Sequence, residues 1–267
     1  PPELLTRDHV ARCIVREIRE GRGTPHGGVY LDISWIKERL KDGAEHIKRK
    51  LPSMYHQFSK LANVDITAEA MEVGPTTHYM MGGIRVDAES QMSTVEGLFA
   101  AGECAAGLHG ANRLGGNSLS DLLVFGKRAG EHAAAYAQSK GAGQLDETQI
   151  DALAKDALAP LEREQGEQPY AIQHELQDQM QNLVGISRQE SEMQQALDVV
   201  SGLEERAKTA SVPGNREYNP GWHTSVDLKH LLTVSRAITL AAIERKESRG
   251  GHFRDDYPDK DEAFAKV

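Results

Sequence analysis

A short segment at residues 139–144, Ser-Lys-Gly-Ala-Gly-Gln, divides the sequence into two parts of different character. Small and polar residues without apolar periodicity are typical of a flexible linker. Before the linker, short alternating or fully apolar runs lie between helical patterns, which predicts an α/β arrangement. After it, apolar residues recur at helical spacing to about residue 248, which predicts an all-α region. The expected fold class is therefore α/β plus all-α.

Local patterns predict particular elements on both sides of the linker. Before it, we expect helices at residues 8–20, 35–50, 54–62 and 118–136, and strands at residues 29–33, 64–66 and 84–86. The run Gly97-Leu-Phe-Ala-Ala101 is fully apolar and bounded by glycine, which favours a buried parallel strand. After the linker, we expect helices within residues 145–208 and over 226–248, joined by an extended connection at residues 211–221.

Composition argues against several classes of function. The 267 residues include 40 acidic and 31 basic side chains with no basic stripe, so we expect no nucleic-acid partner. The longest apolar runs are too short to cross a bilayer. Histidine and cysteine show no metal-ligand spacing, so we expect no metal site. The first residues, Pro-Pro-Glu-Leu-Leu, lack an initiator methionine, and we expect the chain to be a piece of a longer protein.

The residues best suited to chemistry lie between positions 78 and 119. Glu103 follows the apolar run and precedes a glycine-rich stretch, a place where a carboxylate commonly holds a ribose hydroxyl pair. A solvated loop glutamate is the alternative. His78 precedes Gly82-Gly83 and either donates to a carboxylate or caps a turn. Arg7 precedes the first expected helix and is, by position alone, an ordinary solvated arginine.

The run His109-Gly-Ala-Asn-Arg-Leu-Gly-Gly-Asn-Ser-Leu119 places one arginine among small, turn-forming residues before a long helix. Glycine lets the backbone approach a ligand, and the first helical amides, near Ser118 and Leu119, favour an anionic group. The negative edge of a reduced flavin would suit such a site. A helix cap formed by Asn117 or Ser118 is an alternative that can coexist with it. Arg113 is suited to a carboxylate, or lies on the surface.

Three segments together resemble the flavoprotein subunit of succinate dehydrogenase and fumarate reductase. They are Thr77-His-Tyr-Met-Met-Gly-Gly83, residues 97–103 and the run from His109 to Leu119. Residues 6–12, 17–23 and 247–252 resemble the family as well, and residues 24–33 are similar to its actinobacterial-type branch. The resemblance covers nearly the whole chain but only the C-terminal part of the family's length.

The resemblance implies a FAD-binding α/β domain that is interrupted by a capping domain and followed by a helical domain. On that pattern, residues 1–75 are the C-terminal part of the capping domain, and residues 76–137 are the returning segment of a Rossmann-like FAD-binding domain. Residues 138–267 are then a truncated helical C-terminal domain. The sequence contains no G-x-G-x-x-G that opens a βαβ unit, so we expect this chain alone to bind FAD weakly or not at all.

The resemblance also implies the interconversion of succinate and fumarate, with a hydride passing to flavin N5 and a proton to an arginine. It implies these roles: Arg7 as the proton carrier, His78 and Arg113 as ligands of the dicarboxylate, Glu103 at the FAD ribose, and Ser118 and Leu119 as amide donors to the flavin ring. Electrons would pass first to an iron–sulfur subunit, then through a membrane-anchor subunit to quinone. The implied location is the cytoplasmic face of the bacterial plasma membrane.

Two alternatives stay open at this point. L-aspartate oxidase shares the His-Gly-Ala-Asn-Arg-Leu run, but it usually has Cys-Gly-Gly where this chain has Met81-Gly-Gly. It also usually has Ala-Ser where this chain has Gly115-Gly116, and both differences favour the dehydrogenase. The second alternative is a non-catalytic fragment whose helical region, residues 145–248, docks a partner. Retention of yellow flavin by the purified chain would separate an enzyme from such a module.

Overall fold

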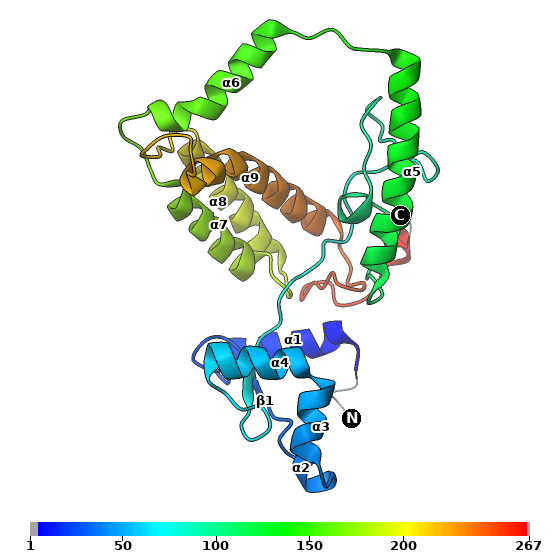
Figure 1. Ribbon diagram of the computed structural model, residues 1–267, viewed down its shortest axis with the longest axis vertical. Coiled ribbons are helices and arrows are strands. Elements are labelled where there is room, and N and C mark those ends of the chain that lie inside the picture. Colours follow the sequence, from blue (N-terminus) through cyan, green and yellow to red (C-terminus); the bar gives the residue numbers. More distant parts are fainter. Residues whose placement is uncertain (1–4, 266–267) are drawn as a thin grey trace. The chain divides into compact units, whose positions relative to one another are not determined.

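The computed structural model describes residues 5–265 and divides into two compact units, one ending at His78 and the other beginning at Tyr79 (Figure 1). The described chain is mostly helical, with one two-stranded sheet. The prediction of an all-α region after the linker is confirmed. The α/β prediction for the first part holds only in coarse form, because this sheet and a few isolated bridges are its only β-structure among residues 5–265.

The unit that ends at His78 packs short helices against a two-stranded antiparallel sheet. Strand β1 pairs with β2 so that Val29 lies opposite Val73. Ile47, Ile66 and Met71 form its buried core, each at most 1% exposed. The elements are α1 (Arg7–Arg19), β1 (Val29–Leu31), α2 (Ile36–Arg39), α3 (Gly43–Lys50), α4 (Pro52–Gln57), the π-helical turn η2 (Phe58–Ala62) and β2 (Met71–Val73).

Two predictions for this unit are wrong, each for a local reason. The helix expected over residues 35–50 breaks into α2 and α3, because Leu40 adopts an extended conformation, with φ −120° and ψ 131°. The strand expected at residues 64–66 is a turn, in which the Asp65 carboxylate accepts hydrogen bonds from the amide and hydroxyl of Thr67 at 2.9 and 2.7 Å. The strand that pairs with β1 comes later in the sequence.

The second unit begins with irregular chain and continues as helices. Its elements are the 3₁₀ turn η3 (Gly102–Cys104), α5 (Asn117–Lys140), α6 (Glu147–Glu162), α7 (Pro169–Leu183), α8 (Glu190–Ala207), α9 (Pro220–Glu244) and the 3₁₀ turn η4 (Glu262–Phe264). The prediction of a buried parallel strand at residues 97–101 is wrong. Phe99 forms only an isolated antiparallel bridge with Met92, and Leu98 is 45% exposed. The strand expected at 84–86 is likewise reduced to single bridges.

Helices α7, α8 and α9 form a three-helix bundle with a continuous apolar core. The fully buried residues are Ile172, Leu176, Val200, Leu203, Ala210, Leu228 and Leu232. Helix α9 begins six residues earlier than predicted, because Pro220 fits the first turn of a helix and the Asn219 side chain accepts the amide of Trp222 at 3.1 Å. No helix within residues 5–265 is long and apolar enough to span a membrane.

Candidate functional site

Arg113 lies in the loop between η3 and α5, and its guanidinium stacks on an aromatic ring. The Arg113 Cζ atom lies 4.4 Å from the centroid of the Tyr79 ring. Its Nε is buried and has no hydrogen-bond partner among the described residues. Within residues 5–265 no carboxylate forms an ion pair with Arg113, so a cation suited to a carboxylate lies there with one buried donor unused.

Tyr79 is held in turn by two residues of the same unit. Its ring meets His109 edge-on, with centroids 5.5 Å apart. His109 Nε2 lies 3.2 Å from the Oδ2 of Asp121, which is 5% exposed and belongs to α5. Burial and the nearby charges of Asp121 and Glu103 raise the pKa of Tyr79.

Glu103 lies in η3 and is exposed. Its Oε1 accepts the backbone amide of Met80 at 2.8 Å, which ties η3 to the segment that carries Tyr79. The carboxylate therefore has a structural contact that the sequence did not predict. Its assignment to a ribose stays a prediction.

Helix α5 begins at Asn117, directly after Gly116, which adopts φ +88°. The helix cap predicted from Asn117 or Ser118 does not form, because the cap position belongs to Gly116 and no described side chain caps this end. The amide of Leu119 is not free, since it donates to the carbonyl of Gly116 at 3.2 Å. Ser118 is half-buried at the exposed start of the helix, and binding of a flavin by these two residues stays a prediction.

The remaining predicted residues belong to the other compact unit. Arg7 is the first residue of α1 and is exposed within its unit. His78 is also exposed and ends that unit, so it directly precedes Tyr79 in the chain. The roles of Arg7 in proton transfer and of His78 in dicarboxylate binding stay predictions.

A glycine pair near the C-terminus contacts the loop that carries Arg113. The amide of Gly251 donates to the carbonyl of Ala111 at 3.0 Å, and a Cβ added to Gly250 would lie 2.2 Å from that oxygen. Gly250 also has φ +61°, so glycine is required there for two reasons. Residues 247–252 belong to a segment that resembles the family. Within that segment, the two adjacent glycines were the only local signal of this contact.

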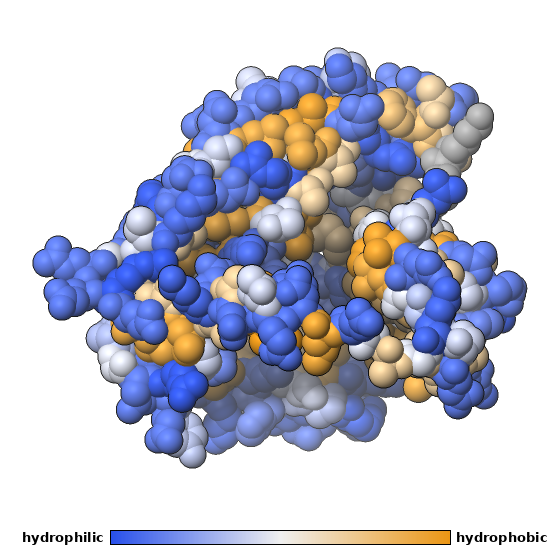
Figure 2. All heavy atoms as spheres, turned by 90° about the horizontal axis from the view of Figure 1, so that it is seen from above, coloured by the Kyte–Doolittle hydropathy of each residue, from blue (hydrophilic) through white to orange (hydrophobic). Residues whose placement is uncertain are grey.

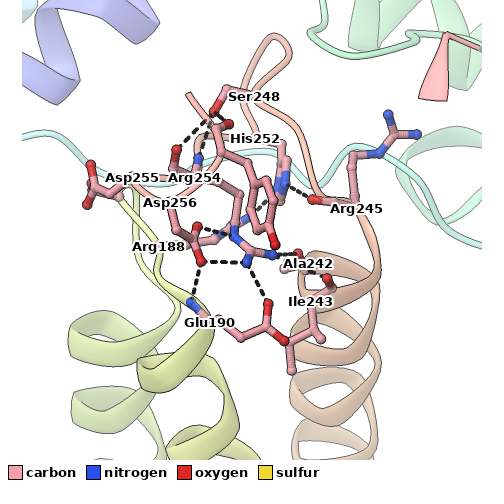
Figure 3. A network of polar contacts seen from close by, with 12 residues as sticks. Arg188, Glu190, Ala242, Ile243, Arg245, Ser248, His252, Arg254, Asp255 and Asp256 are labelled. Atoms are coloured by element: carbon pink, nitrogen blue, oxygen red, sulfur yellow. Dashed lines mark hydrogen bonds and ion pairs between the residues drawn. The ribbon is translucent and has the colours of Figure 1, made fainter. Parts of the chain in front are cut away.

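A buried network of charged groups supports that glycine turn (Figure 3). Arg254 is fully buried, and its Nη1 donates to the carbonyl of Ala242 at 2.9 Å, one of the orphan carbonyls at the end of α9. Its Nε donates to Asp256 at 2.7 Å, and Asp256 accepts the amide of Glu190, at the first turn of α8, at 2.8 Å. Arg254 thereby joins the end of α9 to the start of α8.

Glu247 is the second fully buried charged residue of this region. Its carboxylate accepts hydrogen bonds from Arg249, from the amide of Asp261 and from Arg245. These donors lower the pKa of Glu247 to about 2, despite the opposing effect of burial. The turn that touches Ala111 is therefore anchored by satisfied charges on both sides.

Helix α5 also presents an apolar stripe, which we define as Leu119, Leu122 and Leu123. They are spaced i, i+3 and i+4, and they are 67%, 52% and 76% exposed. Such a stripe normally faces a core. On the face drawn in Figure 2, apolar residues reach the surface in several separate places among mainly hydrophilic ones.

Comparison with known proteins identifies family models and relatives that match this chain. Residues 2–119 match a family model described as an FAD binding domain, and residues 173–267 match one described as the fumarate reductase flavoprotein C-term. A chain of the fumarate reductase (CoM/CoB) of Methanothermobacter marburgensis is 40% identical over 263 residues, covering 96% of this chain and 45% of the relative.

Solved structures agree with the sequence matches. Mycobacterium smegmatis Sdh1, solved in complex with UQ1, is 54% identical with a TM-score of 0.88, over 98% of this chain and 43% of that one. FrdA of E. coli quinol fumarate reductase is 34% identical with a TM-score of 0.86, over 97% of this chain and 45% of that one. The chain thus spans less than half the length of these relatives. It belongs to the family of flavoprotein subunits of succinate dehydrogenase and fumarate reductase, whose cofactor is FAD.

Proposed function

We propose that this chain is the C-terminal part of a flavoprotein that interconverts succinate and fumarate. The observation that carries the proposal is Arg113, a guanidinium stacked on Tyr79 with a buried donor that lacks a partner within the described chain. A planar cation in such a place is suited to one carboxylate of a dicarboxylic acid. The family membership and the names of the relatives support the same substrate class.

The residues of this chain fit part of FAD. Glu103 offers a carboxylate of which only one oxygen has a described hydrogen bond, which suits a ribose hydroxyl. The start of the 24-residue helix α5, which lacks a side-chain cap, is suited to an anionic edge of the flavin ring near Ser118 and Leu119. The sequence has no glycine-rich phosphate loop, so the pyrophosphate would bind outside this chain.

The chemistry is divided between cofactor and protein. FAD, when bound, supplies the acceptor for a hydride. Arg113 and His78 bind a carboxylate and orient the diacid, while Arg7 exchanges the proton with solvent. Because an arginine side chain is normally always charged, Arg7 can act in this way only in a dry site crowded with positive charge, where proton and hydride movements are coupled.

The domain assignment belongs to the same proposal. Residues 1–75 are the C-terminal part of a capping domain, residues 76–137 the returning segment of the FAD-binding domain, and residues 138–267 the helical domain. The apolar stripe of α5 supports this assignment, because the rest of an FAD-binding domain would cover it.

The electron partners are proposed from the relatives. One solved neighbour is a quinol fumarate reductase and another was solved with UQ1, whereas the archaeal relative is named for CoM and CoB. The identity of 54% to the mycobacterial Sdh1 chain favours the actinobacterial-type branch and quinone. We propose two partners at the cytoplasmic face of the plasma membrane, one an iron–sulfur subunit, the other a membrane-anchor subunit.

The test uses the full-length flavoprotein. Succinate should reduce a soluble redox dye, and L-aspartate should not; the reverse result would favour L-aspartate oxidase. Arg113→Ala should abolish the change that a dicarboxylate induces in the flavin spectrum, because the carboxylate loses its bidentate partner. Arg7→Ala and Arg7→Lys should abolish turnover while the flavin stays bound. Turnover near the parent rate in either Arg7 variant would contradict the acid–base assignment.

A further inference from the structure

We infer that Tyr79 and Asp121 are positioning residues that hold the guanidinium of Arg113 in the orientation needed to bind a carboxylate. The inference rests on the proposed function, since it takes Arg113 as the ligand of the dicarboxylate. It concerns two side chains that do not themselves contact the substrate. It is carried by contacts within the unit that begins at Tyr79.

The first step is the stacking contact. The 4.4 Å between Arg113 Cζ and the Tyr79 ring is shorter than the 5.7 Å between the Lys140 ammonium and the Tyr136 ring in the same unit. A guanidinium that stacks through its face keeps its in-plane donors available for a second partner. Arg254 combines the two kinds of contact, since its Cζ lies 4.9 Å from the centroid of the Tyr257 ring while its nitrogens bind the carboxylates of Glu190 and Asp256. The Tyr79 ring is thus the contact within the described chain that fixes the plane of Arg113.

The second step is what fixes the ring. The Asp121 carboxylate lies 3.2 Å from the Nε2 of His109, and the His109 ring packs edge to face against Tyr79 with centroids 5.5 Å apart. A carboxylate that is 5% exposed requires such donors, because a buried charge without partners is costly. The acid therefore fixes the imidazole against which the Tyr79 ring packs.

The third step connects this arrangement to the helix start. Asp121 lies in the second turn of α5, which begins at Asn117, so the same carboxylate relates the start of the helix to the Tyr79 ring. The Glu103 contact to the amide of Met80 holds the backbone next to Tyr79. The Tyr79 ring, the loop that carries Arg113 and the start of α5 are therefore connected through these contacts.

The experiment compares Tyr79→Leu, Tyr79→Phe and a matched control in the full-length flavoprotein. Tyr136→Leu is the control, because it also removes an aromatic–cation contact on α5, roughly 27 Å along the helix from Ser118 at 1.5 Å per residue. The readouts are the dissociation constant of malonate, taken from the flavin difference spectrum, and KM and kcat for succinate.

We expect Tyr79→Leu to raise the malonate dissociation constant and the succinate KM by about 10-fold, the size of a partly desolvated cation–π contact, with a smaller change in kcat. Tyr79→Phe keeps the ring and should stay within about 3-fold of the parent, and Tyr136→Leu should match it. Asp121→Asn should fall between the two Tyr79 variants. Equal losses in Tyr79→Leu and Tyr79→Phe would overturn the role of the ring.

A second measurement does not depend on substrate. Phenylglyoxal, an arginine-selective reagent, should modify Arg113 faster in Tyr79→Leu than in the parent, with Arg128 as internal reference, as followed by peptide mass spectrometry. Unchanged rates would overturn the positioning role. If the parent binds malonate and Tyr79→Leu binds it equally well, the positioning role of Tyr79 is wrong and the proposed function stands. If the parent shows no malonate-dependent spectrum, the proposed function fails and takes this role with it.

Discussion

The three-helix bundle buries its apolar residues, whereas helix α5 leaves its apolar stripe exposed. In the bundle, Leu203, Leu228 and Leu232 are at most 2% exposed. In α5, the apolar stripe is more than half exposed, and the buried residue of the helix is the acid Asp121. The bundle is held by burial of hydrocarbon, whereas the contacts of α5 within this chain include the polar Asp121–His109 pair and the edge-to-face pair of Tyr136 with Phe99.

The difference separates scaffold from site. A hydrophobic core is stabilised by the burial of many apolar atoms, and its stability does not depend on the exact direction of any single polar contact. The Arg113 region instead depends on a few directional contacts, of which the Asp121–His109 pair is one. Four experiments measure that contrast. Each uses the 267-residue chain with Trp35→Phe, so that Trp222 of α9 is the sole tryptophan reporter of urea unfolding.

The largest effect is expected from the bundle core. Leu232→Ala should lower the free energy of unfolding by about 3 kcal/mol, because it removes buried methyl groups and leaves a cavity. Leu123→Ala on α5 removes the same atoms from a side chain that is 76% exposed, and it should cost less than about 0.5 kcal/mol. Equal losses for the two variants would break the comparison.

Next is the buried guanidinium beneath the glycine turn. Arg254→Met should cost about 3 kcal/mol, because the carbonyl of Ala242 loses its donor and the carboxylates of Glu190 and Asp256 lose their partner. Arg216→Met, at an exposed position, serves as the control. A loss below about 1 kcal/mol would show that methionine packing compensates for the lost pairs.

The third effect depends on pH. Because the pKa of folded Glu247 is lowered from 4.5 to about 2, its contribution to stability is complete above about pH 4.5 and is lost as the pH falls toward 2. Glu247→Gln carries no charge at any pH, so its urea midpoint should fall less steeply over that range. Parallel curves for parent and variant would contradict the assignment of this pH dependence to Glu247.

The smallest effect concerns partly exposed ion pairs. Arg236→Ala removes a two-point contact to Glu204 between α8 and α9 and should cost about 1 kcal/mol. Lys127→Ala removes a single 3.6 Å contact to Glu131 on α5, where both side chains are largely exposed, and should cost about 0.3 kcal/mol. A larger loss at Lys127 than at Arg236 would reverse the ranking.

The same contrast explains what the sequence could predict. Helical spacing is a local signal, so α5 was expected close to where it occurs, and helices were expected within residues 145–208, although without separate bounds for α6, α7 and α8. The strand β2 was missed because its pairing with β1 joins segments that are far apart in the sequence. The helix α9 starts before the predicted position because Pro220 begins the helix, whereas two prolines within residues 211–221 are equally typical of an extended connection.

At the site, the loop carrying Arg113 and the start of α5 were expected from small residues before a helix. The supporting contacts were not. Asp121 stands beside two leucines in the sequence, and an acid there hints at a buried partner, but nothing local identifies His109 or Tyr79 as that partner. The contact of Gly250 with Ala111 is equally invisible before folding.

That last contact has a consequence for biosynthesis. Ala111 leaves the ribosome about 140 residues ahead of Gly250, which at typical rates of translation amounts to roughly 10 seconds or more. During that interval the loop that carries Arg113 lacks the contact of Ala111 with Gly250 and Gly251. A ligand or assembly factor that needs the finished loop must therefore wait until Gly250 and Gly251 have been synthesised.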